Sequence, residues 1–217
     1  MGEELSKIEK PLVENYREKR KLYFVPLLFT PKELPDDFKE LIDRYWEQVK
    51  AQLVNLEEKM GKVNAVFHEL VAAGGEEGVE SIEQLNPSSY KLAKSIVDGG
   101  AELCALEDPE ILTEFMDWMK CLTIGLQNKS VMDRVFEFYT ESFNKRNNHI
   151  AVKIDETLKE KQTGILFMRE GHNIQFSGDI ELFYVSPPGL DEIKRWMRQQ
   201  ESKGPDPAEQ NKGSFSN

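Results

Sequence analysis

The sequence is poor in cysteine, in positive charge and in long apolar runs. Its two cysteines, Cys104 and Cys121, lie in apolar surroundings, and their spacing does not match a metal site. We therefore expect two buried, reduced thiols rather than a disulfide or a ligand pair, and hence a reducing compartment. The formal net charge of -11 argues against nucleic acids and anionic membranes, so we expect no nucleic-acid partner.

Membrane-spanning and export signals are also missing from the pattern. Residues 1–10 are charged and lack the apolar core of a signal peptide, and the longest apolar run, residues 23–29, is too short to cross a bilayer. The one basic cluster, Arg17 with residues 19–21, lies among glutamates and predicts a solvated lead-in. We expect a cytoplasmic protein without membrane association.

What the chain has instead is an alternation of short apolar runs with longer amphipathic stretches. The apolar runs predict strands over residues 21–29, 62–69, 102–106, 163–168 and 180–186. Three- and four-residue spacing predicts helices that begin at the capping box of Thr30, at Asn86-Pro87, at Asp108-Pro109, at Ser130 and at about Leu190. This pattern predicts an α/β fold: a central, mostly parallel or mixed sheet of about five strands, flanked by helices that include long amphipathic ones. The short spacing between the last two strands leaves an antiparallel pair open.

The domain organisation follows from the same pattern. Residues 21–200 form a single predicted α/β domain, after a charged lead-in over residues 1–20. Residues 201–217 are too polar to bury a core, and we expect them to be disordered. The glycine-rich segment 72–78 predicts a mobile loop.

The first candidate site residue is Glu69, at the end of the second predicted strand. A carboxylate at the carboxyl end of a strand can act as a catalytic base, or it can be an exposed strand-end acid. His68 should point to the opposite side, because side chains alternate along a strand. The pair His68-Glu69 resembles the start of a zincin motif, but Ala72 stands where the second histidine would be, so we reject that motif.

The second candidate is Arg146, in the long predicted helix. It lies three residues after Phe143 and four before Ile150, within the apolar stripe. A guanidinium that points inward needs an anion, either a ligand or a fixed partner such as Glu69. The alternative is an arginine that extends outward to solvent.

The third candidate is the corner where residues 164–168 end in Arg169, Glu170, Gly171 and His172. Polar residues at the carboxyl end of a buried strand lie where α/β proteins bind ligands, and the glycine permits a tight turn. His172 can act as an acid or a base near neutral pH, or it can be an ordinary turn histidine. We therefore predict Glu69 and His172 as catalytic candidates and Arg146, Arg169, Glu170 and Gly171 as ligand-binding candidates, with no metal ligand and no cofactor identified.

These segments resemble the TraB/PrgY/GumN superfamily, which includes the Tiki-like proteases and is related in fold to the erythromycin-esterase and ChaN-like proteins. The resemblance covers about residues 21–186 and rests on residues 66–69, on residues 146–151 and on residues 165–172. Proteolytic members have a glycine-to-histidine motif at the end of the opening strand, which supplies a metal ligand. Residues 25–30 contain no histidine, and Arg169 replaces the usual first glycine of the later motif. Glu69 and His172 alone fall short of the three protein ligands usual for catalytic zinc.

The resemblance and the residues together give three functional hypotheses. The first choice is a TraB-like domain whose polar cleft at the strand ends binds an anionic small molecule or peptide, as a degenerate hydrolase-like protein. The second is an active hydrolase, metal-assisted or using His172 and Glu69 for acid-base chemistry. The third is a homo-oligomeric interaction module with no ligand site.

Overall fold

The computed structural model describes residues 16, 18–29 and 35–203 of the 217-residue chain. Its strands are β1 (Arg20–Pro26), β2 (Ala65–His68), β3 (Glu102–Leu103), β4 (Thr163–Met168) and β5 (Ile180–Tyr184). They form one five-stranded sheet in the order β3-β2-β4-β1-β5, in which every pairing is parallel. The predicted α/β class is confirmed. The antiparallel alternative for the last two strands is wrong, because β5 pairs with β1 and not with β4.

The helices are α2 (Asp36–Met60), α3 (Gly75–Leu85), α4 (Pro87–Asp98), α5 (Pro109–Thr123), α6 (Lys129–Thr157) and α7 (Pro188–Lys203). Two predicted starts are confirmed by their caps: the Asn86 side chain accepts a hydrogen bond from Ser89 N, and Asp108 caps α5. Helix α6 starts one residue before the predicted Ser130, because Asn128 is its cap.

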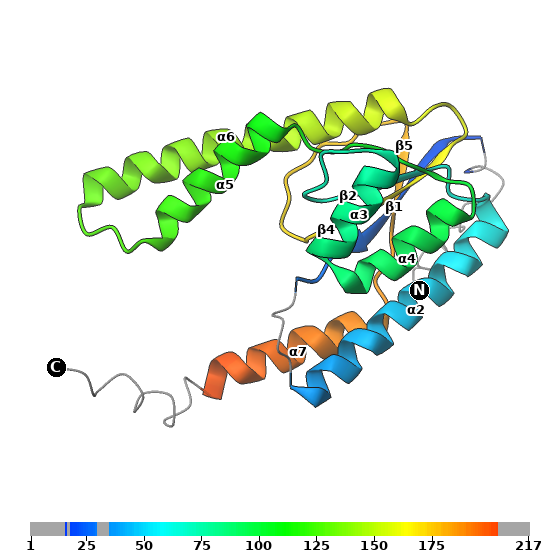
Figure 1. Cartoon of the computed structure of the whole chain (residues 1–217), viewed down its shortest axis with the longest axis horizontal. Coiled ribbons are helices and arrows are strands. Elements are labelled where there is room, and N and C mark those ends of the chain that lie inside the picture. Colours follow the sequence, from blue (N-terminus) through cyan, green and yellow to red (C-terminus); the bar gives the residue numbers. More distant parts are fainter. Residues whose placement is uncertain (1–15, 17, 30–34, 204–217) are drawn as a thin grey trace, which may run out of the picture.

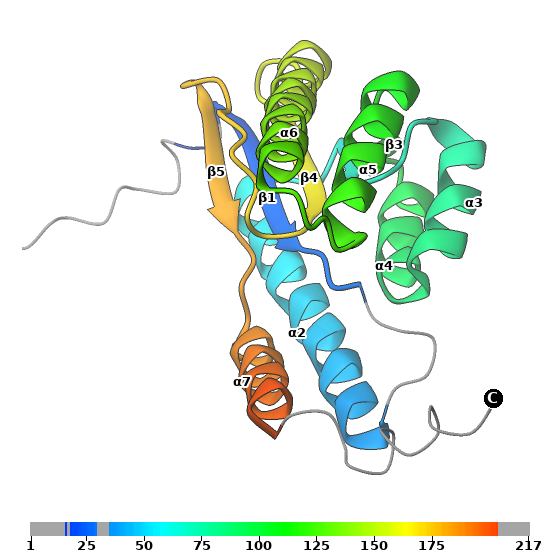
Figure 2. The same cartoon turned by 90° about the vertical axis from the view of Figure 1, so that its left-hand side faces the viewer.

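The helices cover the two faces of the sheet in separate layers (Figures 1 and 2). One face, which includes Tyr23, Val66 and Phe167, packs against α2, α4 and α7. The other face, which includes Phe24 and Leu166, packs against the carboxyl half of α6. Burying each such large apolar side chain contributes about 1.5–3 kcal/mol, so these two layers supply most of the stabilisation of the domain.

Several predicted boundaries are wrong. Residues 72–78 do not form a loop throughout, because α3 begins at Gly75. A side chain at Gly78 would overlap the carbonyl of Ala73 and the side chain of Leu103, so this glycine allows close packing of α3 and does not mark mobility. Strand β1 ends at Pro26, before the predicted residue 29, and β3 covers only two residues. The predicted boundary of the tail at residue 201 falls inside α7, which continues to Lys203.

Some predictions lie outside the described residues. They are the capping box at Thr30, most of the charged lead-in and the part of the predicted disordered tail beyond residue 203. Among the described residues, no helix is both long enough and apolar enough to cross a bilayer.

The sheet has a topological switch between its neighbouring strands β2 and β4. After β2 the chain passes through α3 and α4, which contribute Ile82, Leu92 and Ala93 to the first face. After β4 it runs toward β5 with Ile174 and Phe176 packed on the second face. The chain therefore leaves the two strands in opposite directions at their carboxyl ends, which is the position where open α/β sheets bind ligands.

Candidate functional site

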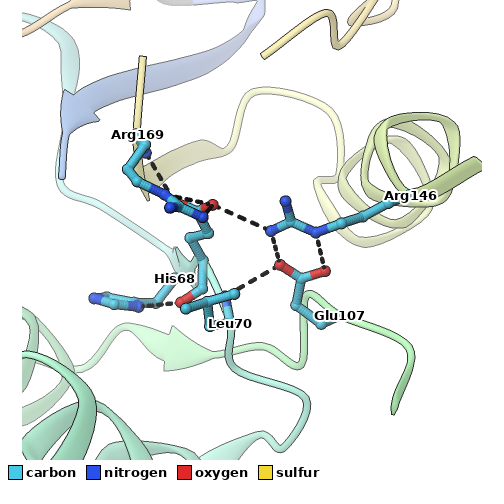
Figure 3. Close-up of polar contacts among 6 residues, drawn as sticks. His68, Leu70, Glu107, Arg146 and Arg169 are labelled. Atoms are coloured by element: carbon cyan, nitrogen blue, oxygen red, sulfur yellow. Dashed lines mark hydrogen bonds and ion pairs between the residues drawn. The ribbon is translucent and has the colours of Figure 1, made fainter. Parts of the chain in front are cut away.

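Glu69 lies at this switch, directly after β2. Its backbone N–H donates to Phe167 O at 2.9 Å, which extends the ladder between β2 and β4 by one bond. Its carboxylate is buried and accepts hydrogen bonds from Arg169, from the backbone N at 2.9 Å and from Nη2 at 2.8 Å (Figure 3). Glu69 is therefore not an exposed strand-end acid, because the first residue after β4 binds its carboxylate.

Arg146 reaches the same carboxylate from α6. Its side chain is buried and donates from Nη2 to Glu69 Oε1 at 3.3 Å and from Nε to Glu107 Oε2 at 2.9 Å. A second bond from Nη2 to Glu107 Oε1 makes the pairing with Glu107 bidentate (Figure 3). The guanidinium also lies over the ring of Phe115, 5.0 Å from its centroid. The inward orientation and the pairing with Glu69 are confirmed, and the outward orientation is wrong.

Glu107 is the site residue that sequence reasoning missed. It lies between β3 and α5, is 4% exposed and also accepts a hydrogen bond from Leu70 N at 3.1 Å. Leu70 adopts a left-handed conformation with φ of 67°, which turns its N–H toward this carboxylate. The rule that selected Glu69, a carboxylate just after a predicted strand, applies equally to Glu107 and could have found it.

Glu69, Glu107, Arg146 and Arg169 thus form one four-residue network with two positive and two negative charges. Burial alone would raise the pKa of Glu69, but the hydrogen bonds and charge of Arg169, together with Arg146, hold that pKa below its usual value. Burial would lower the pKa of Arg146, yet its contacts with Glu107 and Glu69 raise it. The network therefore holds Glu69 and Arg146 in their charged forms despite their burial.

Arg169 is the exposed edge of this network. Its side chain is 41% exposed, whereas those of Glu69, Glu107 and Arg146 are at most 3% exposed. Its guanidinium lies 5.1 Å from the ring centroid of Phe29. Within the described part of the chain, Arg169 Nη1 has no hydrogen-bond partner, because Glu69 occupies only Nε and Nη2. One side of a firmly positioned guanidinium therefore faces outward.

Asn147, next to Arg146, is a buried amide without a partner. The residue is 4% exposed, and neither its Oδ1 nor its Nδ2 has a hydrogen-bond partner among the described residues. It shares a helix face with Ile150 and Ile154, which pack in the same cluster as Phe24. An unsatisfied buried amide is uncommon in folded proteins, so a polar group at this position requires an explanation.

His172 lies beside the network but is not bonded to it. Its ring packs on Phe24 with centroids 4.9 Å apart, and Nδ1 accepts a hydrogen bond from Ile174 N at 3.3 Å. Burial lowers the pKa of His172, and the charge of Glu69 opposes that shift only in part, so the ring is neutral at neutral pH. Gly171 adopts a φ of 90°, which permits the turn that returns the chain over the sheet.

Glu170 does not join the other candidates. Its carboxylate pairs with Lys194 of α7 at 2.6 Å, and both side chains are substantially exposed. The two neighbouring residues therefore have different partners. Arg169 binds within the network, whereas Glu170 forms a surface ion pair that contributes little to stability.

His68 points to the opposite face, as predicted. Its ring stacks on Phe167, and its Nε2 lies 2.9 Å from Ser89 Oγ in α4. Its Nδ1 lies 2.7 Å from the carbonyl O of Glu69, which can only accept, so Nδ1 carries the proton and Nε2 accepts from the serine. Burial lowers the pKa of His68 to about 4. This histidine is a neutral structural link between β2 and α4.

The remaining nucleophilic and metal-binding groups are separate from the network. Cys104 is buried, Cys121 is partly buried, and both are free thiols. Burial raises the pKa of Cys104 to about 11, so this thiol does not ionise at neutral pH. Among the described residues, no three His, Cys, Asp or Glu side chains are grouped in a way that could hold a metal ion.

A separate groove lies between α2 and α4. It has a volume of about 850 Å³ and is open to solvent. Its lining mixes acidic and basic side chains, Asp36, Asp43, Glu47, Lys39, Lys50 and Lys91, around Trp46. It shares no residue with the four-residue network, and so it provides a separate location against which ligand binding at Arg169 can be tested.

Comparison with known proteins identified no relative of this chain. A scan against protein-family models, a search of curated proteins and a search of solved structures each found no match. The class that the fold and the site define is an α/β domain with a buried carboxylate–guanidinium network at the carboxyl edge of a parallel sheet.

Proposed function

We propose that this protein binds the carboxylate of a small molecule or peptide at the outward side of Arg169. The observation that carries the proposal is that Glu69 fixes this guanidinium through Nε and Nη2 while Nη1 stays free of protein partners in the described part of the chain. A guanidinium positioned in this way loses little side-chain entropy when an anion binds, and its planar donors suit a carboxylate.

The charge of the site supports a singly charged ligand group. Two arginines are balanced by Glu69 and Glu107, so the network has no net positive charge to offset a dianion. A phosphate dianion would also be repelled by the Glu69 carboxylate, which lies against the same guanidinium. A carboxylate meets half that repulsion and still gains charge-assisted hydrogen bonds.

Binding without catalysis suits these side chains better than hydrolysis. The Glu69 carboxylate is held by two arginines and has a lowered pKa, so it is a poor proton acceptor at neutral pH. Among the described residues, no carboxylate is hydrogen-bonded to His172. The ring therefore lacks the carboxylate that orients a catalytic histidine in acid-base catalysis. We therefore favour a degenerate, TraB-like binding domain over the active hydrolase, and the two free thiols support a cytoplasmic setting.

A titration with simple ligands tests the proposal. Calorimetry with acetate, succinate and a short peptide with a free C-terminus, alongside inorganic phosphate, should detect binding of a carboxylate to the wild-type protein. Arg169→Gln should weaken that binding about tenfold or more, because a charge-assisted hydrogen bond is worth about 1.5–3 kcal/mol. The matched control is Arg44→Gln, since Arg44 is also half-exposed and paired with a glutamate, Glu192, at 2.8 Å. Equal affinity in both variants and the wild type would reject the proposal.

A further inference from the structure

Helices α5 and α6 form a hairpin whose distal part extends away from the sheet (Figure 1). Within the hairpin the two helices pack through Phe115, Tyr139 and Phe143. The distal part also exposes large apolar side chains to solvent: Ile124, Val131, Met132, Phe136 and Phe138 are each at least 43% exposed. Such a concentration of exposed apolar side chains in one element is typical of an interaction surface.

One stripe of α6 combines these apolar side chains with charge. Val131, Arg134, Phe138 and Glu141 follow one another at steps of three, four and three residues, so they lie along one face of the helix. All four are exposed. Phe138 stacks on Trp118 of α5, with centroids 4.8 Å apart, so the stripe is backed by a fixed aromatic pair.

The two charges of this stripe have no partner within the described part of the chain. Some other charged residues of the hairpin are paired, Lys129 with Asp133 at 2.6 Å and Lys145 with Glu114 at 2.8 Å. Neither Arg134 nor Glu141 makes an ion pair or a side-chain hydrogen bond with any described residue. They lie on opposite sides of Phe138, four residues before it and three after it.

We propose that this stripe, residues 131–141 of α6, is a docking surface for a second copy of the same chain, related by a two-fold axis beside Phe138. In an antiparallel pair centred there, Arg134 of each copy lies opposite Glu141 of the other, and the two Phe138 rings meet between these ion pairs. The stripe is thus complementary to itself in both charge and apolar character. A single-sign or purely apolar stripe would not specify this antiparallel register.

The size of the surface predicts a reversible dimer. The stripe spans about 10 residues and so about 15 Å of helix, which is short for an interface of standard size. We expect an affinity that depends on concentration and on salt, because the ion pairs lie at the surface. This inference does not depend on the proposed carboxylate site, since the two involve different residues and separate measurements.

Charge reversal with rescue tests the proposal in sedimentation velocity experiments on the full chain over a wide concentration range. The wild type should show a monomer–dimer equilibrium. Arg134→Glu and Glu141→Arg should each raise the dimer Kd about tenfold, because each replaces two attractive contacts with two repulsive ones. The double variant should restore the dimer, because the ion pairs form again with reversed signs. A monomeric wild type, or a double variant no better than the single ones, would overturn the proposal.

A second pair of variants distinguishes docking at this stripe from nonspecific hydrophobic association. Phe136 is 59% exposed, more than Phe138, but lies outside the stripe. Phe138→Ala should weaken the dimer, whereas Phe136→Ala should leave it unchanged. If Phe136→Ala weakened the dimer more than Phe138→Ala, a different face of the hairpin would be the interface and the proposed register would be wrong.

Discussion

Glu69 and Arg169 are 100 residues apart in the chain, yet the Glu69 carboxylate accepts hydrogen bonds from both the backbone N and the side chain of Arg169. The pairing arises because β2 and β4 are parallel neighbours and each residue directly follows its strand. It fixes the one exposed guanidinium of the network at the position where parallel sheets bind ligands.

Removing Glu107 should destabilise the fold strongly. Glu107→Ala leaves the buried guanidinium of Arg146 with the 3.3 Å contact to Glu69 as its one remaining contact with a carboxylate among the described residues, and breaking a buried ion pair costs about 3–5 kcal/mol. Urea denaturation measures this loss. Glu114→Ala is the control, because its pair with Lys145 is exposed and worth at most about 1 kcal/mol. A similar small loss in both variants would mean that the network does not support the fold.

Stability should fall between pH 7 and pH 5 because of His68. The folded pKa is about 4, below the ordinary value of 6.5, so within this window the unfolded chain binds a proton that the folded chain excludes. The free energy of unfolding should therefore decrease by about 2 kcal/mol on going from about pH 7 to about pH 5. Urea denaturation at the two pH values measures the change.

The variant His68→Gln isolates this contribution, since it removes the titrating group and should flatten the pH dependence whatever its effect on stability at pH 7. His172→Gln is the comparison, because the pKa of His172 is also lowered but its ring is only partly buried. If the free energy of unfolding of His68→Gln fell as steeply with pH as that of the wild type, another group would control the pH dependence.

Replacing Asn147 with an apolar residue should stabilise the protein. Its amide is buried without a partner, and such a group costs about 1–3 kcal/mol, so Asn147→Leu should raise the free energy of unfolding. The neighbouring Asn148 is exposed, and Asn148→Leu should change the stability by less than about 0.5 kcal/mol. Thermal melting of the two variants beside the wild type measures both changes in stability. A less stable Asn147→Leu variant would contradict this interpretation.

The alternation of apolar runs and amphipathic stretches predicts most of the fold, because each layer is encoded in the local spacing of apolar side chains. Strand β4 and the caps at Asn86 and Asp108 match the predictions residue by residue. The partner of β5 could not be predicted, since pairing depends on how the chain crosses the sheet. Helix α3 was missed because glycine normally marks a loop, whereas Gly78 permits close packing.

The candidate site could be predicted only in part. Glu69 and Arg146 were identifiable because each departs from its local pattern, the first as an acid after a strand and the second as a charge in an apolar stripe. That Arg169 would bind Glu69 while its neighbour Glu170 would pair with Lys194 depends on the direction of the chain after β4, which no local pattern encodes. Glu107 follows the same rule as Glu69, yet its role depends on the position of α6 above it.

A crystal structure of the protein grown with the tightest-binding carboxylate tests the central claim most directly. The account predicts a ligand carboxylate oxygen within hydrogen-bond distance of Arg169 Nη1, with Glu69 still bound to Nε and Nη2. A carboxylate found instead in the groove between α2 and α4, with Arg169 unoccupied, would contradict it.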